Sequence, residues 1–210
     1  LRSAPRIWAP GCSTGEEAYS IAITLLEAGA RPHIFGTDLS DTAIVRARAG
    51  VYSEGEMVNV SSERRRRFFT QTGPEWHVSP ALRDACTFAQ QDLTIDPPFP
   101  YLDLISCRNL LIYLGGDLQK KLMPIFHYAL NRGSYLFLGT SETVGEFVDL
   151  FAPLDRKQKL YQRREDIHSA QHPALGRFVP PMTALNAAIP RVGKSAFPIK
   201  QQLRELAENA

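Results

Sequence analysis

The sequence lacks the features that define several large classes of protein. No apolar run approaches the roughly 20 residues of a membrane-spanning helix, and no secretory signal opens the chain. The three cysteines, Cys12, Cys86 and Cys107, are too few and too scattered for a disulfide framework. They have no CxxC spacing either, so we expect no metal site and a reducing, cytoplasmic environment.

A large excess of charge of either sign is also missing. The 24 Lys+Arg residues oppose 22 Asp+Glu residues, which leaves a net charge of +2. This balance gives no electrostatic basis for a nucleic-acid partner or for insertion into an anionic membrane. We therefore interpret the basic run Arg64–Arg67 as a solvated helix face.

What is present is the composition of an ordinary globular domain. Hydrophobic residues make up 44% and charged residues 22% of the 210 positions, enough to bury one sizeable core. The first residue is Leu1 rather than methionine, so we expect this chain to be a fragment of a longer protein.

Short apolar runs alternate with helical patterns over the first three quarters of the chain. Such alternation predicts an α/β fold, a doubly wound, mostly parallel sheet covered on both faces. The expected strands are 6–9, 33–37, 103–107, 134–139 and an antiparallel last strand at 159–163, with a further strand at 86–89. The expected helices are 16–28, 41–49 and 118–130, and Pro124 should kink or divide the last of these.

Two segments depart from this alternation. Residues 51–91 are longer and less regular than a connection needs, so we expect a small inserted subdomain within a domain spanning 1–164. Residues 165–210 contain five prolines and little periodicity. They predict a linker or tail with a possible terminal helix at 200–208.

The strongest local signal is a glycine-bearing loop between the first strand and the first helix. Gly11 and Gly15 permit positive φ or a close backbone approach, and Ser13 lies between them. The loop has neither the Gly-x-Gly-x-x-Gly pattern nor a phosphate-loop lysine. Glu16 and Glu17 open the helix instead, which favours a cationic group, although two glutamates also complement a helix dipole.

Acidic residues follow two further expected strands. Asp38 ends the second strand, about 20 residues beyond the glycine loop, where a carboxylate commonly accepts ribose hydroxyls. Helix capping is the alternative role, but Ser40 already fits it. Asp92 and Leu93 follow the run 86–91, where a carboxylate and a backbone N–H suit an adenine edge; taken alone, a loop aspartate is the simpler interpretation.

A third group of polar residues follows the strand at 103–107. Arg108, Asn109 and Tyr113 come directly after it, and ligands of open α/β sheets bind outside the carboxyl ends of strands. We therefore expect these residues to face the same crevice as Gly11 and Asp38. The simpler alternative is that Arg108 and Asn109 turn the chain while Tyr113 packs.

These signals, in this order, resemble the S-adenosylmethionine-dependent methyltransferases of the chemotaxis-receptor type, the CheR family. The matching runs are CSTGEEAYS (12–20), FGTDLS (35–40), ARAGVY (47–52), DLISCRNLLIY (103–113) and FLGTSE (137–142). The resemblance covers roughly residues 5–164. It is strongest to multidomain CheB–CheR fusion proteins, in which other domains share the chain.

The resemblance implies a Rossmann-like class I methyltransferase sheet and a role for each site residue. Glu16 would hold the ammonium group of S-adenosylmethionine, Asp38 its ribose, and Asp92 with Leu93 its adenine. Gly11, Ser13 and Gly15 would form the cofactor loop, Arg108 and Asn109 would line the pocket, and Arg108 and Tyr113 would act at the transferred methyl. The family usually has asparagine at the position of Asp92, and aspartate still accepts from an amino group.

The implied reaction methylates glutamate carboxylates of a receptor-like signalling protein and leaves S-adenosylhomocysteine. The resemblance also implies a helical N-terminal segment, which the given sequence does not include. We therefore do not expect full activity from this chain alone. The alternative function is a catalytically weak cofactor-binding or docking module of a multidomain sensory protein. A nicotinamide dehydrogenase would share Asp38, but the glycine loop does not fit one.

Overall fold

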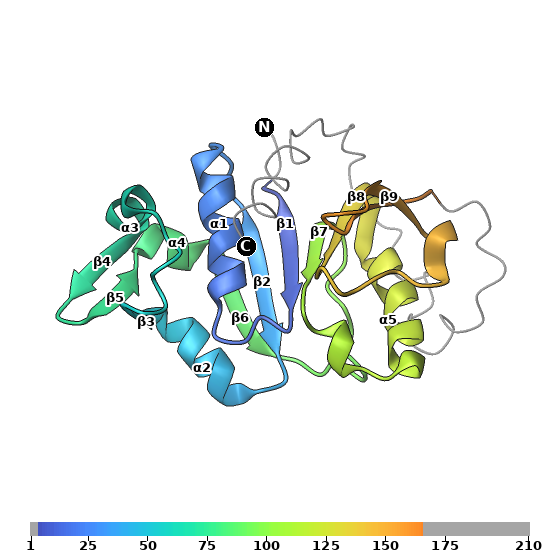
Figure 1. The fold of residues 1–210 in the computed structure, drawn as a ribbon, viewed down its shortest axis with the longest axis horizontal. Helices are drawn as coiled ribbons and strands as arrows, with labels where there is room; N and C mark the ends of the chain where they lie inside the picture. The colour runs from blue at the N-terminus through green and yellow to red at the C-terminus, as the bar shows by residue number, and fades with distance from the viewer. Residues whose placement is uncertain (1–3, 166–210) are drawn as a thin grey trace, which may run out of the picture.

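A computed structural model of the chain describes residues 4–165, which form two β-sheets (Figure 1). The larger sheet has seven strands in the order β6-β2-β1-β7-β8-β10-β9. The strands are β1 (Arg6–Pro10), β2 (His33–Asp38), β6 (Cys86–Gln90), β7 (Leu102–Cys107), β8 (Leu130–Leu138), β9 (Phe151–Asp155) and β10 (Leu160–Arg163). The α/β fold with a doubly wound sheet is confirmed.

Five neighbouring strands of this sheet are parallel. Central β1 pairs with β2 from Arg6 opposite His33 onward, and pairs on its other side with β7. The antiparallel last strand is also confirmed, because Tyr161 of β10 lies opposite Leu136 of β8. Edge strand β9 was not predicted, and its Pro153 weakens the strand pattern while remaining tolerable at an edge.

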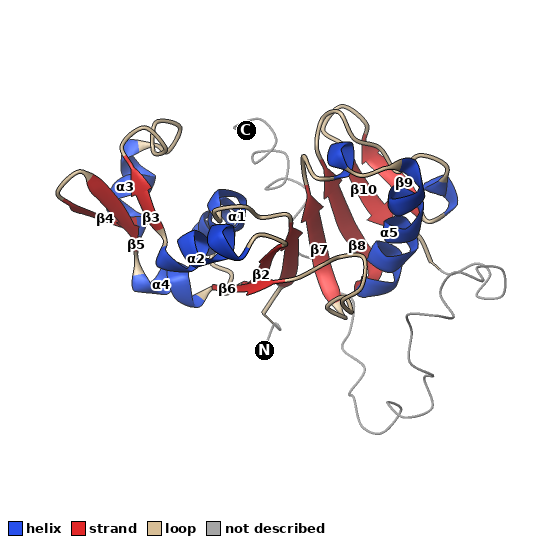
Figure 2. Ribbon diagram, turned by 90° about the horizontal axis from the view of Figure 1, so that it is seen from below, coloured by secondary structure: helices blue, strands red, loops and turns tan. Residues whose placement is uncertain are grey.

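Helices cover both faces of the sheet, with α1 (Glu16–Glu27) and α2 (Asp41–Ala49) on one and α5 (Gly116–Ala129) on the other (Figure 2). Alternate residues of each strand separate the core into two clusters. Ile7 and Leu104 belong to the cluster that contains α1 residues, while Trp8 packs with Phe126 of α5. Two short 3-10 turns, η1 (Leu111–Tyr113) and η2 (Phe147–Asp149), complete the domain.

The helix ends follow the local chemistry of the sequence. The Ser40 hydroxyl caps α2 by accepting from the N–H of Ala43, as predicted, and Gly50 ends that helix in the left-handed conformation. Pro124 was expected to kink or divide this helix, and division is excluded because α5 runs through it as one helix. A buried proline costs the helix one hydrogen bond, and packing against the sheet compensates for that loss.

Between α2 and β6 lies a smaller, separate sheet with order β3-β5-β4, to the left in Figure 1. It comprises β3 (Val51–Ser53), β4 (Phe69–Thr72) and β5 (Glu75–Val78), with helix α3 (Ser62–Phe68). Helix α4 (Pro80–Asp84) then leads into β6. Strand β6 is an edge strand of the main sheet, so the run 86–89 pairs on one side only.

The basic face of α3 is partly neutralised. Arg64 pairs with Glu27 at 2.7 Å, and Arg65 pairs with Glu54 at 2.6 Å. Within residues 4–165, no helix is long and apolar enough to cross a membrane. The predicted tail, including the helix expected at 200–208, lies outside the described residues.

Candidate functional site

The loop that follows β1 meets the end of β2. The backbone N–H of Cys12 donates to the carbonyl of Thr37 at 3.0 Å, and the N–H of Ser13 donates to the Asp38 carboxylate at 2.9 Å. The glycine loop and Asp38 therefore lie side by side, as the sequence predicted.

Asp38 uses both carboxylate oxygens to join two loops. Oδ2 accepts from Ser13, while Oδ1 accepts from the N–H of Ser40 at 2.9 Å. The capping bond of α2 comes from the Ser40 hydroxyl. Each carboxylate oxygen can accept a second hydrogen bond, so Asp38 can hold these loops and still accept from ribose hydroxyls.

Both glycines of the loop adopt positive φ, +70° at Gly11 and +97° at Gly15. A Cβ at Gly11 would lie 3.1 Å from the Leu110 side chain, so this loop also touches the segment after β7. A Cβ at Gly15 would lie 3.0 Å from Cβ of Ala47 in α2. Gly15 therefore serves both the backbone turn and the close approach of α2.

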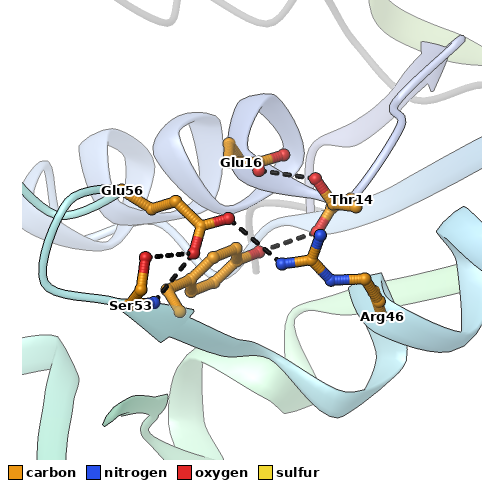
Figure 3. A network of polar contacts seen from close by, with 6 residues as sticks. Thr14, Glu16, Arg46, Ser53 and Glu56 are labelled. Atoms are coloured by element: carbon orange, nitrogen blue, oxygen red, sulfur yellow. Dashed lines mark hydrogen bonds and ion pairs between the residues drawn. The ribbon is translucent and has the colours of Figure 1, made fainter. Parts of the chain in front are cut away.

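The two glutamates that open α1 have different surroundings. Glu16 is exposed and accepts a 2.5 Å hydrogen bond from the Thr14 hydroxyl (Figure 3). Glu17 is half-buried and accepts a 2.5 Å hydrogen bond from the Ser106 hydroxyl of β7. The sequence pattern did not distinguish the two glutamates, because the direction of each side chain depends on the packing of α1, and only the family resemblance gave Glu16 a role.

A cavity of about 790 Å³ runs along α1 between the end of β7 and the inserted subdomain. Its lining includes both glutamates, Ser106, Arg108 and Phe137, together with Met57 and Phe69 of the inserted part. Glu16 and Arg108 are the predicted site residues that share this lining. The other predicted site residues follow the strand ends and are not part of this lining: Gly11, Ser13, Asp38, Asp92, Leu93, Asn109 and Tyr113.

Arg108 can donate a hydrogen bond that no residue within 4–165 accepts. Its guanidinium lies 5.0 Å from the centre of the Phe137 ring, and its buried Nε has no hydrogen-bond partner among residues 4–165. Buried polar atoms are nearly always paired, so an unpaired Nε indicates a place for an acceptor. A guanidinium suits a carboxylate, while the carboxylates of Glu16 and Asp38 suit the ammonium group and the ribose hydroxyls of S-adenosylmethionine.

Burial raises the pKa of Glu17 to about 7. The Ser106 hydroxyl and Arg108 act in the opposite direction, and Glu142 adds to the rise. The folded protein therefore keeps Glu17 protonated at pH values where the unfolded chain has lost the proton. This protonation stabilises the fold below the unfolded pKa, near 4.5, and the contribution is lost as the pH rises through about 7.

Glu17→Gln should remove this pH dependence, because an amide mimics the protonated acid. We expect wild type to lose on the order of 2 kcal/mol relative to Glu17→Gln between pH 5 and pH 8. Melting curves at several pH values measure the difference, and Glu16→Gln in the same helical turn is the matched control. A constant difference in stability between wild type and Glu17→Gln over this range would contradict the raised pKa of Glu17.

The segment after β7 is held by a residue to which the sequence analysis gave no role. The Glu142 carboxylate accepts from the backbone N–H groups of Asn109, Leu111 and Gly139. Tyr113 follows in η1, and its side chain is 79% exposed. Glu142 follows a parallel strand at the same sheet edge as Arg108, and this position was the signal available in the sequence.

Asp92 and Leu93 follow β6 beside the end of β2, where the N–H of Gln91 donates to the carbonyl of Asp38. The Asp92 carboxylate accepts from both the N–H and the hydroxyl of Thr94, and these bonds lower its pKa. Leu93 packs against the cluster on the α5 face. The loop that contains Asp92 thus begins beside Asp38, and a local turn orders it.

A hydrogen bond joins the inserted subdomain to the glycine loop. The Tyr52 hydroxyl donates to the carbonyl of Thr14 at 2.9 Å, and Arg46 of α2 pairs with Glu56 at 3.1 Å (Figure 3). The smaller sheet therefore supports the same loop that contains Ser13 and Gly15.

The thiols do not offer a nucleophile at this site. Burial raises the pKa of Cys12 to about 12 and holds that of Cys107, next to Arg108, well above its usual value. Among residues 4–165, no three His, Cys, Asp or Glu side chains gather in a way that could hold a metal ion.

Comparisons with known proteins extend these observations. An uncharacterised 104.1 kDa protein of Rhodobacter capsulatus is 33% identical over 92% of this chain and 22% of its own length. Chemotaxis protein methyltransferase 1 of Pseudomonas aeruginosa is 34% identical over 69% of this chain and 57% of its own length. Among solved structures, a TehB-like SAM-dependent methyltransferase of Corynebacterium glutamicum matches 78% of this chain and 80% of its own, with 14% identity and a TM-score of 0.47.

The chain thus spans less than two thirds of the length of both relatives. Residues 2–160 match the family model described as the SAM-binding domain of CheR methyltransferases. S-adenosylmethionine is accordingly the cofactor of this domain, in agreement with the carboxylates of Glu16 and Asp38. The chain belongs to the CheR methyltransferase family.

Proposed function

We propose that this domain transfers the methyl group of S-adenosylmethionine to glutamate side chains of a chemoreceptor-like signalling protein. The chemotaxis methyltransferase of Pseudomonas aeruginosa, 34% identical, supports the reaction class. The structural observation that supports it best is Arg108, directly after β7, whose buried Nε has no partner within residues 4–165. Such a group can orient a substrate carboxylate beside the cofactor.

The reaction needs no general base. Bound S-adenosylmethionine supplies a methyl group made electrophilic by its sulfonium. As the carboxylate oxygen bonds to the methyl carbon, the carbon–sulfur bond breaks and sulfur keeps the electron pair, giving a methyl ester and S-adenosylhomocysteine. A free glutamate has a pKa of about 4.3, so the nucleophile is already ionised at neutral pH and no proton moves.

Residues at the ends of β1, β2 and β6 hold the cofactor in this proposal. Asp38 accepts from the ribose hydroxyls, and Glu16 attracts the ammonium group. Asp92 and Leu93 bracket the adenine beside Asp38. Gly11, Ser13 and Gly15 allow the loop backbone to approach the cofactor, since no side chain at either glycine intervenes.

Residues after β7 align the substrate. Arg108 orients the incoming carboxylate, Asn109 lines the cofactor pocket, and exposed Tyr113 lies on the approach to the methyl group. The rate depends on holding the reacting atoms in line, because positioning supplies most of the catalysis when no proton is transferred. The substrate carboxylate loses its negative charge as the ester forms. A tight contact with Arg108 would therefore stabilise the ionised substrate more than the transition state, so a loose contact serves better.

The substrate is a protein with exposed glutamates, and other domains of a longer parent chain are further partners. The 104.1 kDa relative, of which this chain matches 22%, supports a large parent. We place the reaction in the cytoplasm, where the three free thiols stay reduced.

The test is methyl transfer by the full-length parent protein to receptor fragments, with S-adenosylmethionine labelled in its methyl group. A glutamate methyl ester releases labelled methanol in mild alkali, whereas methyl groups on nitrogen do not. We expect alkali-labile label that disappears when the receptor glutamates are replaced by alanine. Alkali-stable label would contradict carboxylate methylation, and cofactor binding without transfer would identify a docking module instead.

A further inference from the structure

Glu142 is one of the most deeply buried charged side chains among residues 4–165, with 4% of its surface exposed. Its Oε2 accepts from Gly139 at 2.6 Å and from Asn109 at 3.1 Å, and its Oε1 accepts from Leu111 at 2.7 Å. Hydrogen bonds to a charged group are stronger than neutral ones, and three backbone donors can stabilise a buried carboxylate. Two of these donors belong to the segment after β7, so Glu142 joins the end of β8 to that segment.

The segment that Glu142 holds turns sharply at Asn109. Its φ of +58° lies in the left-handed region, which asparagine tolerates better than most residues other than glycine. It persists where the surroundings fix it, and the Asn109 N–H is one of the three that Glu142 binds. Arg108 immediately precedes Asn109, so the same contact limits the direction in which its guanidinium leaves β7.

Space around Glu142 is also restricted. A Cβ added at Gly139 would lie 2.8 Å from Glu142 Oε2 and 2.9 Å from the backbone nitrogen of Asn109. Glycine at 139 therefore lets the carboxylate and the segment after β7 approach each other. The motif FLGTSE (137–142) supplies both the glycine and the carboxylate.

We propose that Glu142 is a positioning residue, which places Arg108 and Asn109 against the cofactor and substrate through the backbone of the segment after β7. This inference rests on the proposed function, which puts Arg108 and Asn109 in the pocket. Glu142 itself touches neither ligand in the proposal.

The test compares Glu142→Ala and Glu142→Gln with a matched control at the opposite end of the same sheet. Asp103, at the start of β7, also accepts two hydrogen bonds, from the N–H of Arg6 and the amide of Asn131. Asp103→Ala therefore removes a bonded carboxylate far from the strand ends that form the site. For each variant we would measure the melting temperature, the affinity for S-adenosylhomocysteine and, in the full-length parent, kcat and KM of methyl transfer.

We expect Glu142→Ala to lower kcat at least tenfold more than Asp103→Ala at a comparable melting temperature. Glu142→Gln should recover part of the rate, because its amide oxygen still accepts from one side of the site. Should Glu142→Ala not fold, Glu142→Gln alone decides: a fall in kcat with an unchanged melting temperature supports positioning.

If kcat falls in the Glu142 and Asp103 variants only in proportion to the loss of melting temperature in each, the inference is overturned. If Asp38→Ala weakens cofactor binding while the Glu142 variants bind and react normally, the inference fails and the proposed function stands. If neither Asp38 nor Glu142 matters, the proposed site itself is wrong.

Discussion

Replacing Asp38 with alanine should weaken the binding of S-adenosylhomocysteine by roughly one to two decades. A hydrogen bond to a charged group contributes about 1.5–3 kcal/mol, and each 1.4 kcal/mol is tenfold in affinity. The same variant should melt a few degrees earlier, because the N–H groups of Ser13 and Ser40 lose their carboxylate acceptor. Calorimetric titration beside a ligand-free melting curve measures both effects, and Asp38→Asn should recover part of the affinity.

Ser40→Ala is the matched control for this variant. It removes the hydroxyl that caps α2, which costs about 1 kcal/mol of stability, yet it leaves the Asp38 carboxylate in place. We expect it to melt earlier while binding S-adenosylhomocysteine nearly as wild type does. An Asp38→Ala protein that behaves like Ser40→Ala, melting early and binding normally, would show that Asp38 only orders the loops.

Replacing Arg108 with alanine should lower the rate of methyl transfer about 100-fold, since a misplacement of about 1 Å can cost this much. Affinity for S-adenosylhomocysteine should change less than the rate, because the proposal has Arg108 orient the carboxylate of the substrate, which is absent from this binary complex. Arg108→Lys should restore little of the rate, since an ammonium keeps the charge but not the planar fork. Single-turnover measurements with the full-length parent separate the transfer step from binding.

Arg6 provides a control with similar packing. Its guanidinium lies 4.9 Å from the centre of the Phe35 ring, close to the 5.0 Å between Arg108 and Phe137, but at the opposite end of the sheet. Arg6→Ala should therefore lose a comparable stacking contact without slowing transfer. Equal rates in the Arg6 and Arg108 variants would show that Arg108 contributes packing alone.

The main sheet was predictable because its signals are local. Short hydrophobic runs placed β1, β2 and β7, and a helical pattern with a Ser40 cap placed α2. Elements that depend on distant partners were harder to find. Strand β9 exists by pairing with β10, and α5 continues through Pro124 because packing outweighs the local cost.

The residues of the candidate site also fall into two groups, those that the sequence could place and those that it could not. Residues that follow a strand, such as Asp38 and Arg108, could be placed from strand order alone, since parallel strands end at one edge of a sheet. Glu142 also follows a strand, but its role, like that of Glu17, depends on the direction of its side chain. The sequence does not show that Glu17 turns toward Ser106, nor that Glu142 reaches Asn109 across 33 positions.

The most direct test of the proposed site is an NMR titration of the chain, labelled with ¹⁵N at glycine, with S-adenosylhomocysteine. Gly11 and Gly15 lie in the loop after β1, and Gly139 lies beside Glu142 and Asn109. Gly73 lies between β4 and β5, and Gly133 lies near the start of β8, so both are away from these strand ends. We predict large shifts of the Gly11, Gly15 and Gly139 amides with Gly73 and Gly133 unchanged, whereas shifts confined to Gly73 or Gly133 would contradict the site.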